Sequence, residues 1–290
     1  MGSAECTLIK VNGYRLSVIG KKLAALVLCI GALPFVFGAG AYAGENERKS
    51  LKDEFTYNAQ ARIQTSYLWR GLYSGGPNIQ ASANVGFYGV YLDMWWNVGF
   101  HDMTFKSFQP EVDFSLGFNR WGLNIYALYI HNFNCGFFDF TNYYGKGNRL
   151  ELNLMYTIPK THLTVRWGTR IAASDCYLNA AGEIVRAYSS YAEIFYTQHL
   201  PYGMSLYGAF GFSPWKSIYS FYQRDFTVSN IELRLRKDWT VEKRCGLMLQ
   251  GQLCINPSAL AADKSTAKWH PDFPGNQSIN ANITFGVYLK

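Results

Sequence analysis

The most informative shortage in this sequence is charge. Asp, Glu, Lys and Arg make up 16% of its 290 residues, whereas soluble globular domains carry roughly 25%. Apolar residues reach 49%, yet only residues 23–37 form a long apolar stretch. The chain therefore lacks the apolar runs that a bundle of membrane-spanning helices needs. These two shortages disfavour an ordinary soluble domain and exclude a membrane protein built from several helices.

Cysteine and histidine are also scarce, with six and five residues. The cysteines show no Cys-x-x-Cys spacing and have no pair of histidines nearby, so neither a zinc site nor another cofactor is expected. Cys135 and Cys176 both fall in predicted external loops, and the sequence leaves open whether they pair. Cys245 and Cys254 stand at opposite ends of one predicted strand, roughly 30 Å apart at 3.3 Å per residue, which excludes a disulfide between them.

Residues 1–43 have the features of a signal peptide with a long n-region. A basic pair precedes the apolar stretch, and Ala41-Tyr42-Ala43 offers small residues at both recognition positions of a cleavage site. Because residues 1–20 precede the basic pair, the true translation start is left open. The alternative, an uncleaved membrane helix, is disfavoured by Pro34 and by the cleavage site. Residues 44–54 are charged and polar, and we interpret them as a periplasmic lead-in.

From residue 55 onward, apolar and polar residues alternate at every step in successive segments. In the last segment, apolar residues occupy every second position from Ile279 to Leu289. A period of two is that of a β-strand with one apolar and one polar face. The sequence therefore predicts an all-β fold, a single antiparallel up-and-down transmembrane β-barrel of about 12 strands over residues 55–290, preceded by the cleavable signal peptide. The predicted segments are 55–69, 78–87, 89–101, 108–120, 122–133, 147–157, 161–172, 187–200, 203–214, 225–237, 246–256 and 276–289.

The connections between the segments alternate between tight and long. Tight links lie around Tyr88, Trp121, Pro159 and Tyr202, and longer loops lie between them. Short turns of outer-membrane barrels face the periplasm and long loops face outside, which orients the predicted barrel. The alternative fold is a secreted β-sandwich or jelly roll, which also needs alternating strands. It is disfavoured because aromatic residues flank nearly every segment and outward Lys and Glu are few.

If the apolar residues of each segment face lipid, the alternate residues face a lumen, and almost every charge within a segment falls among them. A basic residue at the lipid midplane costs about 2–4 kcal/mol, so this coherence supports the barrel. The charged residues either form ion pairs that fill the lumen or line a constriction on a solute path. Acids and arginines are equal in number, so no ion selectivity is predicted. The predicted lumen-lining residues are Arg62, Asp93, Glu111, Asp113, Arg149, Glu151, Arg166, Arg170, Glu193, Glu232, Arg234 and Arg236.

Short motifs near the start of the predicted barrel resemble those of one known family. They are Ser66-x-x-Trp69-Arg70-Gly71, Asn78-Ile79-Gln80, Gly86-Phe87-Tyr88-Gly89 and Glu111-x-Asp113, followed by Tyr143-Tyr144 and Arg149-x-Glu151. With them the chain is similar to the TorF-like porins, a family of bacterial outer-membrane proteins. The resemblance implies an outer-membrane β-barrel of porin type, and it supplies neither a catalytic signature nor a binding site. One departure is the carboxyl end, Tyr288-Leu289-Lys290, because such barrels commonly finish on an aromatic residue.

These features predict a narrow porin-like channel in the bacterial outer membrane, exported through the periplasm, for small polar solutes or ions of unknown identity. The expected partners are outer-membrane lipid, lipopolysaccharide and the barrel-assembly machinery. Nucleic acid is not expected, since no basic run or helix carries the mild excess of positive charge. The alternative is a structural or surface-binding barrel with a plugged lumen. The sequence leaves the oligomeric state open.

Trp69 and Arg70 are the predicted rim of the pore. Trp69 is amphipathic and is expected at the lipid–water boundary. Arg70 is the next residue on the inner frame, where it is expected to reach across the mouth. Two other roles for Arg70 stay open, namely capping a strand end and binding a lipopolysaccharide phosphate.

A lipid-modifying enzyme is the remaining alternative, because some small barrels carry a Ser–His pair at the membrane surface. His101 and His131 lie near external ends of predicted strands. The sequence has no Gly-x-Ser-x-Gly or His-Glu-x-x-His motif. No serine can be placed beside either histidine, as a nucleophile and its base require. The sequence therefore favours a protein that is not an enzyme and has no catalytic residues.

Overall fold

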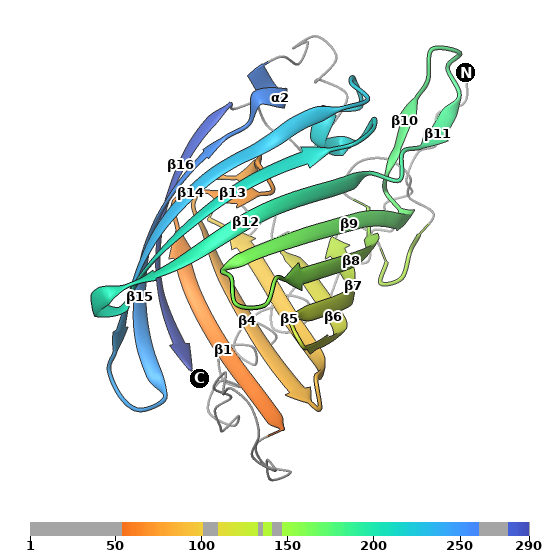
Figure 1. Cartoon of the computed structure of the whole chain (residues 1–290). Helices are drawn as coiled ribbons and strands as arrows, with labels where there is room; N and C mark the ends of the chain where they lie inside the picture. The colour runs from red at the N-terminus through yellow and green to blue at the C-terminus, as the bar shows by residue number, and fades with distance from the viewer. Residues whose placement is uncertain (1–53, 101–109, 133–135, 141–146, 261–277, 290) are drawn as a thin grey trace, which may run out of the picture. The chain divides into compact units, whose positions relative to one another are not determined.

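The computed structural model describes residues 54–100, 110–132, 136–140, 147–260 and 278–289. The predicted signal peptide and all of the lead-in except Glu54 lie outside these residues. Twelve strands form one closed antiparallel barrel (Figure 1), because β1 pairs with both β4 and β16. The predicted fold class is therefore confirmed. The barrel strands are β1 (Phe55–Gln64), β4 (Asn78–Phe87), β5 (Val90–Gly99), β6 (Glu111–Arg120), β7 (Leu123–Asn132), β8 (Arg149–Thr157), β9 (Leu163–Ala173), β12 (Ser190–Leu200), β13 (Met204–Ser213), β14 (Thr227–Thr240), β15 (Cys245–Ile255) and β16 (Ile279–Leu289).

The smaller elements belong to the connections between barrel strands. Two of them are hairpins, β2 (Tyr67–Trp69) with β3 (Leu72–Gly75), and β10 (Cys176–Leu178) with β11 (Ile184–Arg186). The short helices are η2 (Pro201–Gly203), η3 (Ile218–Ser220) and α2 (Pro257–Leu260). In the part of the chain that the structure describes, no helix combines the length and the apolar character needed to cross a membrane.

Two barrel strands end three or more residues away from the predicted end. The first segment, predicted as 55–69, ends at Gln64. The backbone N–H of Ser66 donates to the side-chain Oδ1 of Asn282, at 3.1 Å, instead of to a strand carbonyl. The ladder therefore stops there, and the chain turns into the β2–β3 hairpin. At the other end of the sequence, β14 runs to Thr240, three residues beyond the predicted segment.

Two tight turns explain how neighbouring strands stay in register. Tyr88 and Gly89 have φ values of 52° and 86°, and Trp121 and Gly122 have 55° and 80°. Positive φ at both central residues is the hairpin turn whose twist matches that of the flanking strands. A side chain at Gly122 would also place its Cβ 2.7 Å from the carbonyl oxygen of Thr157, so only glycine fits this position.

The outer face of the barrel is apolar, as the alternation predicts. On β16, Ile283 is 61% exposed and Phe285 47%, whereas Asn282 between its apolar neighbours is 3% exposed and Thr284 is 1%. Large exposed apolar side chains recur on the other barrel strands. Soluble monomers rarely expose contiguous apolar patches of more than a few hundred Å². A surface of this kind is suited to hydrocarbon rather than to water.

Candidate functional site in the barrel lumen

All twelve charged residues predicted to line the lumen lie on the inner frame, opposite the exposed apolar residues. Five of them are between 1% and 8% exposed, namely Arg149, Glu151, Arg170, Glu193 and Glu232. The other seven are partly exposed, namely Arg62, Asp93, Glu111, Asp113, Arg166, Arg234 and Arg236. Withdrawing a charge from water costs several kcal/mol unless the charge is paired. The interaction partners of these five buried residues therefore determine whether their charges are stable inside the lumen.

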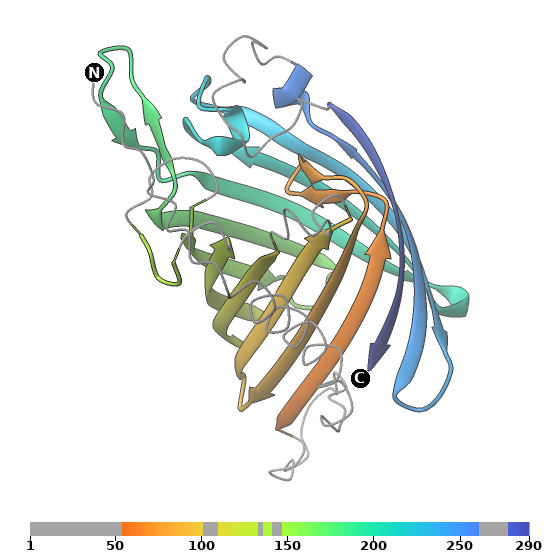
Figure 2. The same cartoon turned by 180° about the vertical axis from the view of Figure 1, so that it is seen from behind.

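The β2–β3 hairpin crosses the lumen. It begins beside β1, yet its tip contacts β8, β12 and β14 on other sides of the ring, and Figure 2 shows it inside the circle of barrel strands. Near its start, the Tyr67 hydroxyl donates to Glu111 Oε1 at 2.8 Å, and the Tyr67 ring lies 5.5 Å from that of Trp95. The hairpin thus contacts β5, β6, β8 and β14 at the same time.

Arg70 at the tip of the hairpin holds it to β8. Its Nη2 donates to Glu151 Oε1 at 2.5 Å and its Nη1 to Glu151 Oε2 at 3.0 Å, a bidentate pair. Further bonds run to Asn153 Oδ1, at 3.0 Å, and to the Tyr219 hydroxyl, at 2.8 Å. Burial by itself would lower the pKa of Arg70, but Glu151 and Tyr219 hold that pKa well above its ordinary value. Arg70 is therefore a buried cation that its hydrogen bonds hold in one position in the lumen.

The turn of the hairpin leaves no room for a side chain at Gly71. Arg70 and Gly71 have φ values of 50° and 84°, and Trp69 pairs with Leu72 across them. A Cβ on Gly71 would lie 1.8 Å from the carbonyl oxygen of Ser229 on β14. The Gly71 carbonyl also accepts a hydrogen bond from Asn256 Nδ2 at 3.0 Å. The backbone of the tip therefore lies directly against β14, three strands along the ring from β1.

The predicted position of Trp69 at the lipid–water boundary is wrong. Trp69 lies in the hairpin, with its ring centroid 5.8 Å from that of Tyr219 and packed against a buried cluster that includes Tyr219 and Tyr191. Arg70 lies 4.6 Å from the Trp69 ring and Arg170 lies 5.4 Å from it. The reason is the bend at Ser66, which turns the Trp69 segment out of the barrel wall and into the lumen.

The side chain of Arg170 on β9 is buried without hydrogen bonds to any described residue. It is 1% exposed, and none of its three guanidinium nitrogens has a hydrogen-bond partner among the described residues. Its compensation is electrostatic, from Asp175 and Glu151, and aromatic, from the rings of Trp69 and Tyr219. An arginine held in this way depends on the hairpin, because Trp69 is one of the groups that cover it.

A second network lies on β9, β12 and β14. Glu193 Oε2 lies 3.3 Å from Arg166 Nη1, and Glu232 forms an ion pair with Arg234. Asn230 Nδ2 joins the two acids, at 3.2 Å from Glu193 Oε1 and 3.3 Å from Glu232 Oε2. The acidic groups on this wall are therefore paired.

Charges of like sign also lie close together in two places. Arg62 on β1 interacts electrostatically with Arg234 and Arg236 on β14. Asp113 on β6 interacts in the same way with Glu111 of its own strand. In the ring of twelve strands, β6 is the sixth strand from β14 in either direction. Arg234 and Arg236 of β14 therefore lie on the opposite side of the ring from Glu111 and Asp113 of β6.

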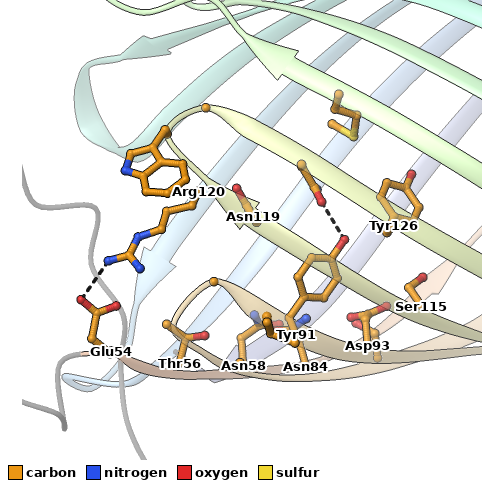
Figure 3. Close-up of a pocket in the computed structure, with 18 of the residues that line it drawn as sticks. Glu54, Thr56, Asn58, Asn84, Tyr91, Asp93, Ser115, Asn119, Arg120 and Tyr126 are labelled. Atoms are coloured by element: carbon orange, nitrogen blue, oxygen red, sulfur yellow. Dashed lines mark hydrogen bonds and ion pairs between the residues drawn. The ribbon is translucent and has the colours of Figure 1, made fainter.

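A cavity of about 650 Å³ occupies the lumen at the end where the tight turns lie. It begins at the turns that contain Gly89 and Gly122 and reaches inward to Gln60, Asp93 and Ser115. Its lining is dominated by neutral polar side chains, several of which are labelled in Figure 3. The two parts of the lumen thus differ, since the hairpin occupies the loop-facing part and this cavity occupies the turn-facing part.

Sequence reasoning missed several members of this site. Tyr191, Asn153 and Asn230 stand on the inner frame of their strands, so the alternation could have found them had neutral residues been included. Tyr219 comes from η3 in a loop between β13 and β14. Nothing in its local sequence indicates that it contacts Arg70.

His131, considered above for catalysis, and Cys176, considered for a disulfide, both lie at the loop-facing end of the barrel. The buried ring of His131 stacks on Tyr129, with centroids 6.3 Å apart, and its Nδ1 lies 2.9 Å from Asn148 Oδ1; His101 lies outside the described residues. Cys176 forms no disulfide with any described residue. Cys135 is not among the described residues, so whether the two pair is still open. Within the described ranges, no group of three His, Cys, Asp or Glu residues could hold a metal ion.

Comparison with known proteins yields structural likenesses alone. No family model matches the chain, and no curated protein matches its sequence. Among solved structures, the NanC porin is similar over 81% of this chain and 100% of its own, with 10% identity and a TM-score of 0.42. The KdgM porin is similar over 80% of this chain and 98% of its own, with 8% identity and a TM-score of 0.40. An outer membrane channel from Pseudomonas putida F1 is similar over 80% of this chain and 94% of its own, with 9% identity and a TM-score of 0.41. At such low identities and scores, the assignment of the fold rests on this chain's own closed ring of strands.

Proposed function

We propose that this chain is a channel of porin type in the bacterial outer membrane, and that it passes small polar solutes or ions through its charged lumen. The observation that carries the proposal is the contrast between the two faces of one closed ring, apolar and exposed outside, polar and charged inside. A closed barrel satisfies every strand hydrogen bond without an open edge, which hydrocarbon requires. Membership of the TorF-like porin family, with outer-membrane lipid, lipopolysaccharide and the barrel-assembly machinery as partners, belongs to the same proposal.

The β2–β3 hairpin sets the width of this channel. Side chains alone fill barrels of eight strands, whereas sixteen or more strands leave a wide aqueous channel. With twelve strands, the lumen is wide enough to admit a hairpin, and here the hairpin is fastened to Glu151 by Arg70. Solutes that enter from the cavity therefore meet their narrowest passage beside this hairpin.

Bilayer recording tests the proposal. Purified protein inserted into a planar lipid bilayer is expected to give discrete current steps of small, uniform size. Heat-dependent migration on a gel, which reports a folded barrel, is the control for each preparation. Silence of the folded protein across salts and voltages would contradict the channel.

Within the channel, charge reversal is expected to change ion selectivity. Asp113→Lys should shift the reversal potential in a salt gradient toward anion preference, and Arg234→Glu should shift it toward cation preference, because each group faces the lumen. Glu242→Lys and Arg244→Glu are matched controls, since these residues lie exposed between β14 and β15. Selectivity that stays unchanged in both lumen variants would mean that Asp113 and Arg234 lie off the solute path.

A second candidate is a structural or surface-binding barrel whose lumen is permanently plugged. The burial of Arg70, Glu151, Arg170 and Glu193 in the loop-facing part of the lumen favours it. The two candidates separate on the wild-type recording, because a permanent plug gives no current steps.

A further inference from the structure

The turn-facing cavity of the lumen has a composition that points to a class of ligand. Its volume of about 650 Å³ falls within the roughly 300–1,000 Å³ of small-molecule sites. Figure 3 shows Asn58, Asn84, Tyr91 and Asp93 on neighbouring strands at one side of the cavity. Side-chain amides and hydroxyls both donate and accept hydrogen bonds, so this lining matches a solute with many hydroxyl groups.

Charge in the cavity is confined to a few positions. At the mouth, Arg120 Nη2 lies 3.4 Å from Glu54 Oε1, so these two charges compensate each other (Figure 3). Deeper in, Asp93 stands directly opposite Asn84 on the paired strand. Among the described residues of the lining, Asp93 is the one carboxylate without a cationic partner. The inner part of the cavity is therefore negative.

Aromatic side chains border the same space. The Tyr91 hydroxyl donates to Asn124 Oδ1 at 2.8 Å, which fixes the Tyr91 ring within the cavity. Tyr126 and Trp121 also contribute to the lining. Aromatic rings combine an apolar face with a polar group at one end, which suits the flat apolar face of a pyranose whose hydroxyls need hydrogen bonds.

We propose that this cavity binds a polyhydroxylated solute that carries an ammonium group, of the size of an amino sugar, with the ammonium paired to Asp93. The proposal rests on the channel function and names its solute class. The amides around Asp93 take the hydroxyl groups, and an aromatic ring covers one face of the sugar. An acidic sugar is disfavoured, because its carboxylate would face Asp93 while Arg62, Arg234 and Arg236 lie outside the lining.

Titration calorimetry on the folded full chain in detergent tests this assignment, with glucosamine, glucose and glucuronate as probes of similar size and different charge. Affinity is expected to fall in that order. Asp93→Asn should lower glucosamine affinity about tenfold, which corresponds to about 1.4 kcal/mol, and bring it to the level of glucose. Asp93→Glu, which keeps the charge, should retain most of the glucosamine affinity, and Glu242→Gln outside the cavity should change nothing.

Three results would overturn the assignment. They are equal glucosamine affinity in wild type and Asp93→Asn, tighter binding of glucuronate than of glucosamine, and no binding of any probe at millimolar concentration. Binding does not require current, so these outcomes are independent of the bilayer recording. A protein that conducts but binds none of the probes would contradict the proposed solute class and would leave the proposed channel function standing.

Discussion

Replacement of residues 67–75 by a flexible Gly-Ser linker of equal length is expected to raise single-channel conductance several-fold. These residues form the hairpin that crosses the lumen, and their contacts with β6, β8 and β14 disappear with them. The linker keeps the connection from β1 to β4 without the side chains that fill the passage. The measurement is the step size in a planar bilayer, compared with wild type under the same salt and voltage.

The β10–β11 hairpin supplies the matched control. It has a similar size, but it extends away from the end of the barrel in both views (Figures 1 and 2). Its replacement by a linker should therefore leave the step size unchanged. Equal conductance of the wild type and the variant lacking β2–β3 would show that the hairpin does not limit passage.

The second large effect concerns stability. Arg70→Ala is expected to lower the free energy of unfolding by about 3–5 kcal/mol, because the substitution leaves Glu151 buried without its bidentate partner. Glu151 is 1% exposed, so water cannot replace the lost bonds. The measurement is urea unfolding of the refolded barrel, followed by tryptophan fluorescence at equilibrium.

The more exposed ion pair between Arg120 and Glu54 is the control for the loss of stability in Arg70→Ala. Arg120→Ala breaks this pair, in which the Arg120 side chain is 35% exposed and the Glu54 side chain 18%. Because surface ion pairs contribute about 1 kcal/mol or less to stability, this substitution should cost no more than that. The double substitution Arg70→Ala with Glu151→Ala should recover part of the loss, because it removes the orphaned charge along with its partner. If Arg70→Ala costs no more than Arg120→Ala, the hairpin is not held by this pair.

The barrel was predictable from the sequence because its environment acts on every strand separately. Lipid outside and a polar lumen inside impose a period of two on each segment, and a period of two can be recognised without knowing which strands are neighbours. The tight turns were visible for a similar local reason, since the pairs Tyr88-Gly89 and Trp121-Gly122 allow the left-handed conformation that the turns require.

The hairpin was not predictable, because the interactions that create it are distant in sequence. Apart from Thr65 and Leu68, the alternation continues through Trp69, so residues 55–69 have the pattern of one strand. What ends β1 is the side chain of Asn282, 216 residues from Ser66. Arg70 and Glu151 are likewise separated by 81 residues. A pattern within one segment contains no information about such contacts.

The candidate site was predictable in part. The inner frame of the charged residues follows from the strand period, and a pair such as Glu232 and Arg234 follows from their spacing of two on one strand. The division of the lumen into a part that holds the hairpin and a part that holds the cavity depends on where the hairpin lies, which only the three-dimensional structure shows. The cavity around Asp93 therefore had no signal in the sequence.

The central claim is that one face of each barrel strand contacts hydrocarbon and the other contacts a polar lumen. A nitroxide scan along β16, with single cysteines from Ile279 to Val287 in a cysteine-free background in lipid vesicles, tests it most directly. Collision rates with oxygen should peak at Ile279, Ala281, Ile283, Phe285 and Val287, and collision rates with oxygen should be low at Asn280, Asn282, Thr284 and Gly286. Rates that do not alternate, or that alternate with the opposite phase, would contradict the account.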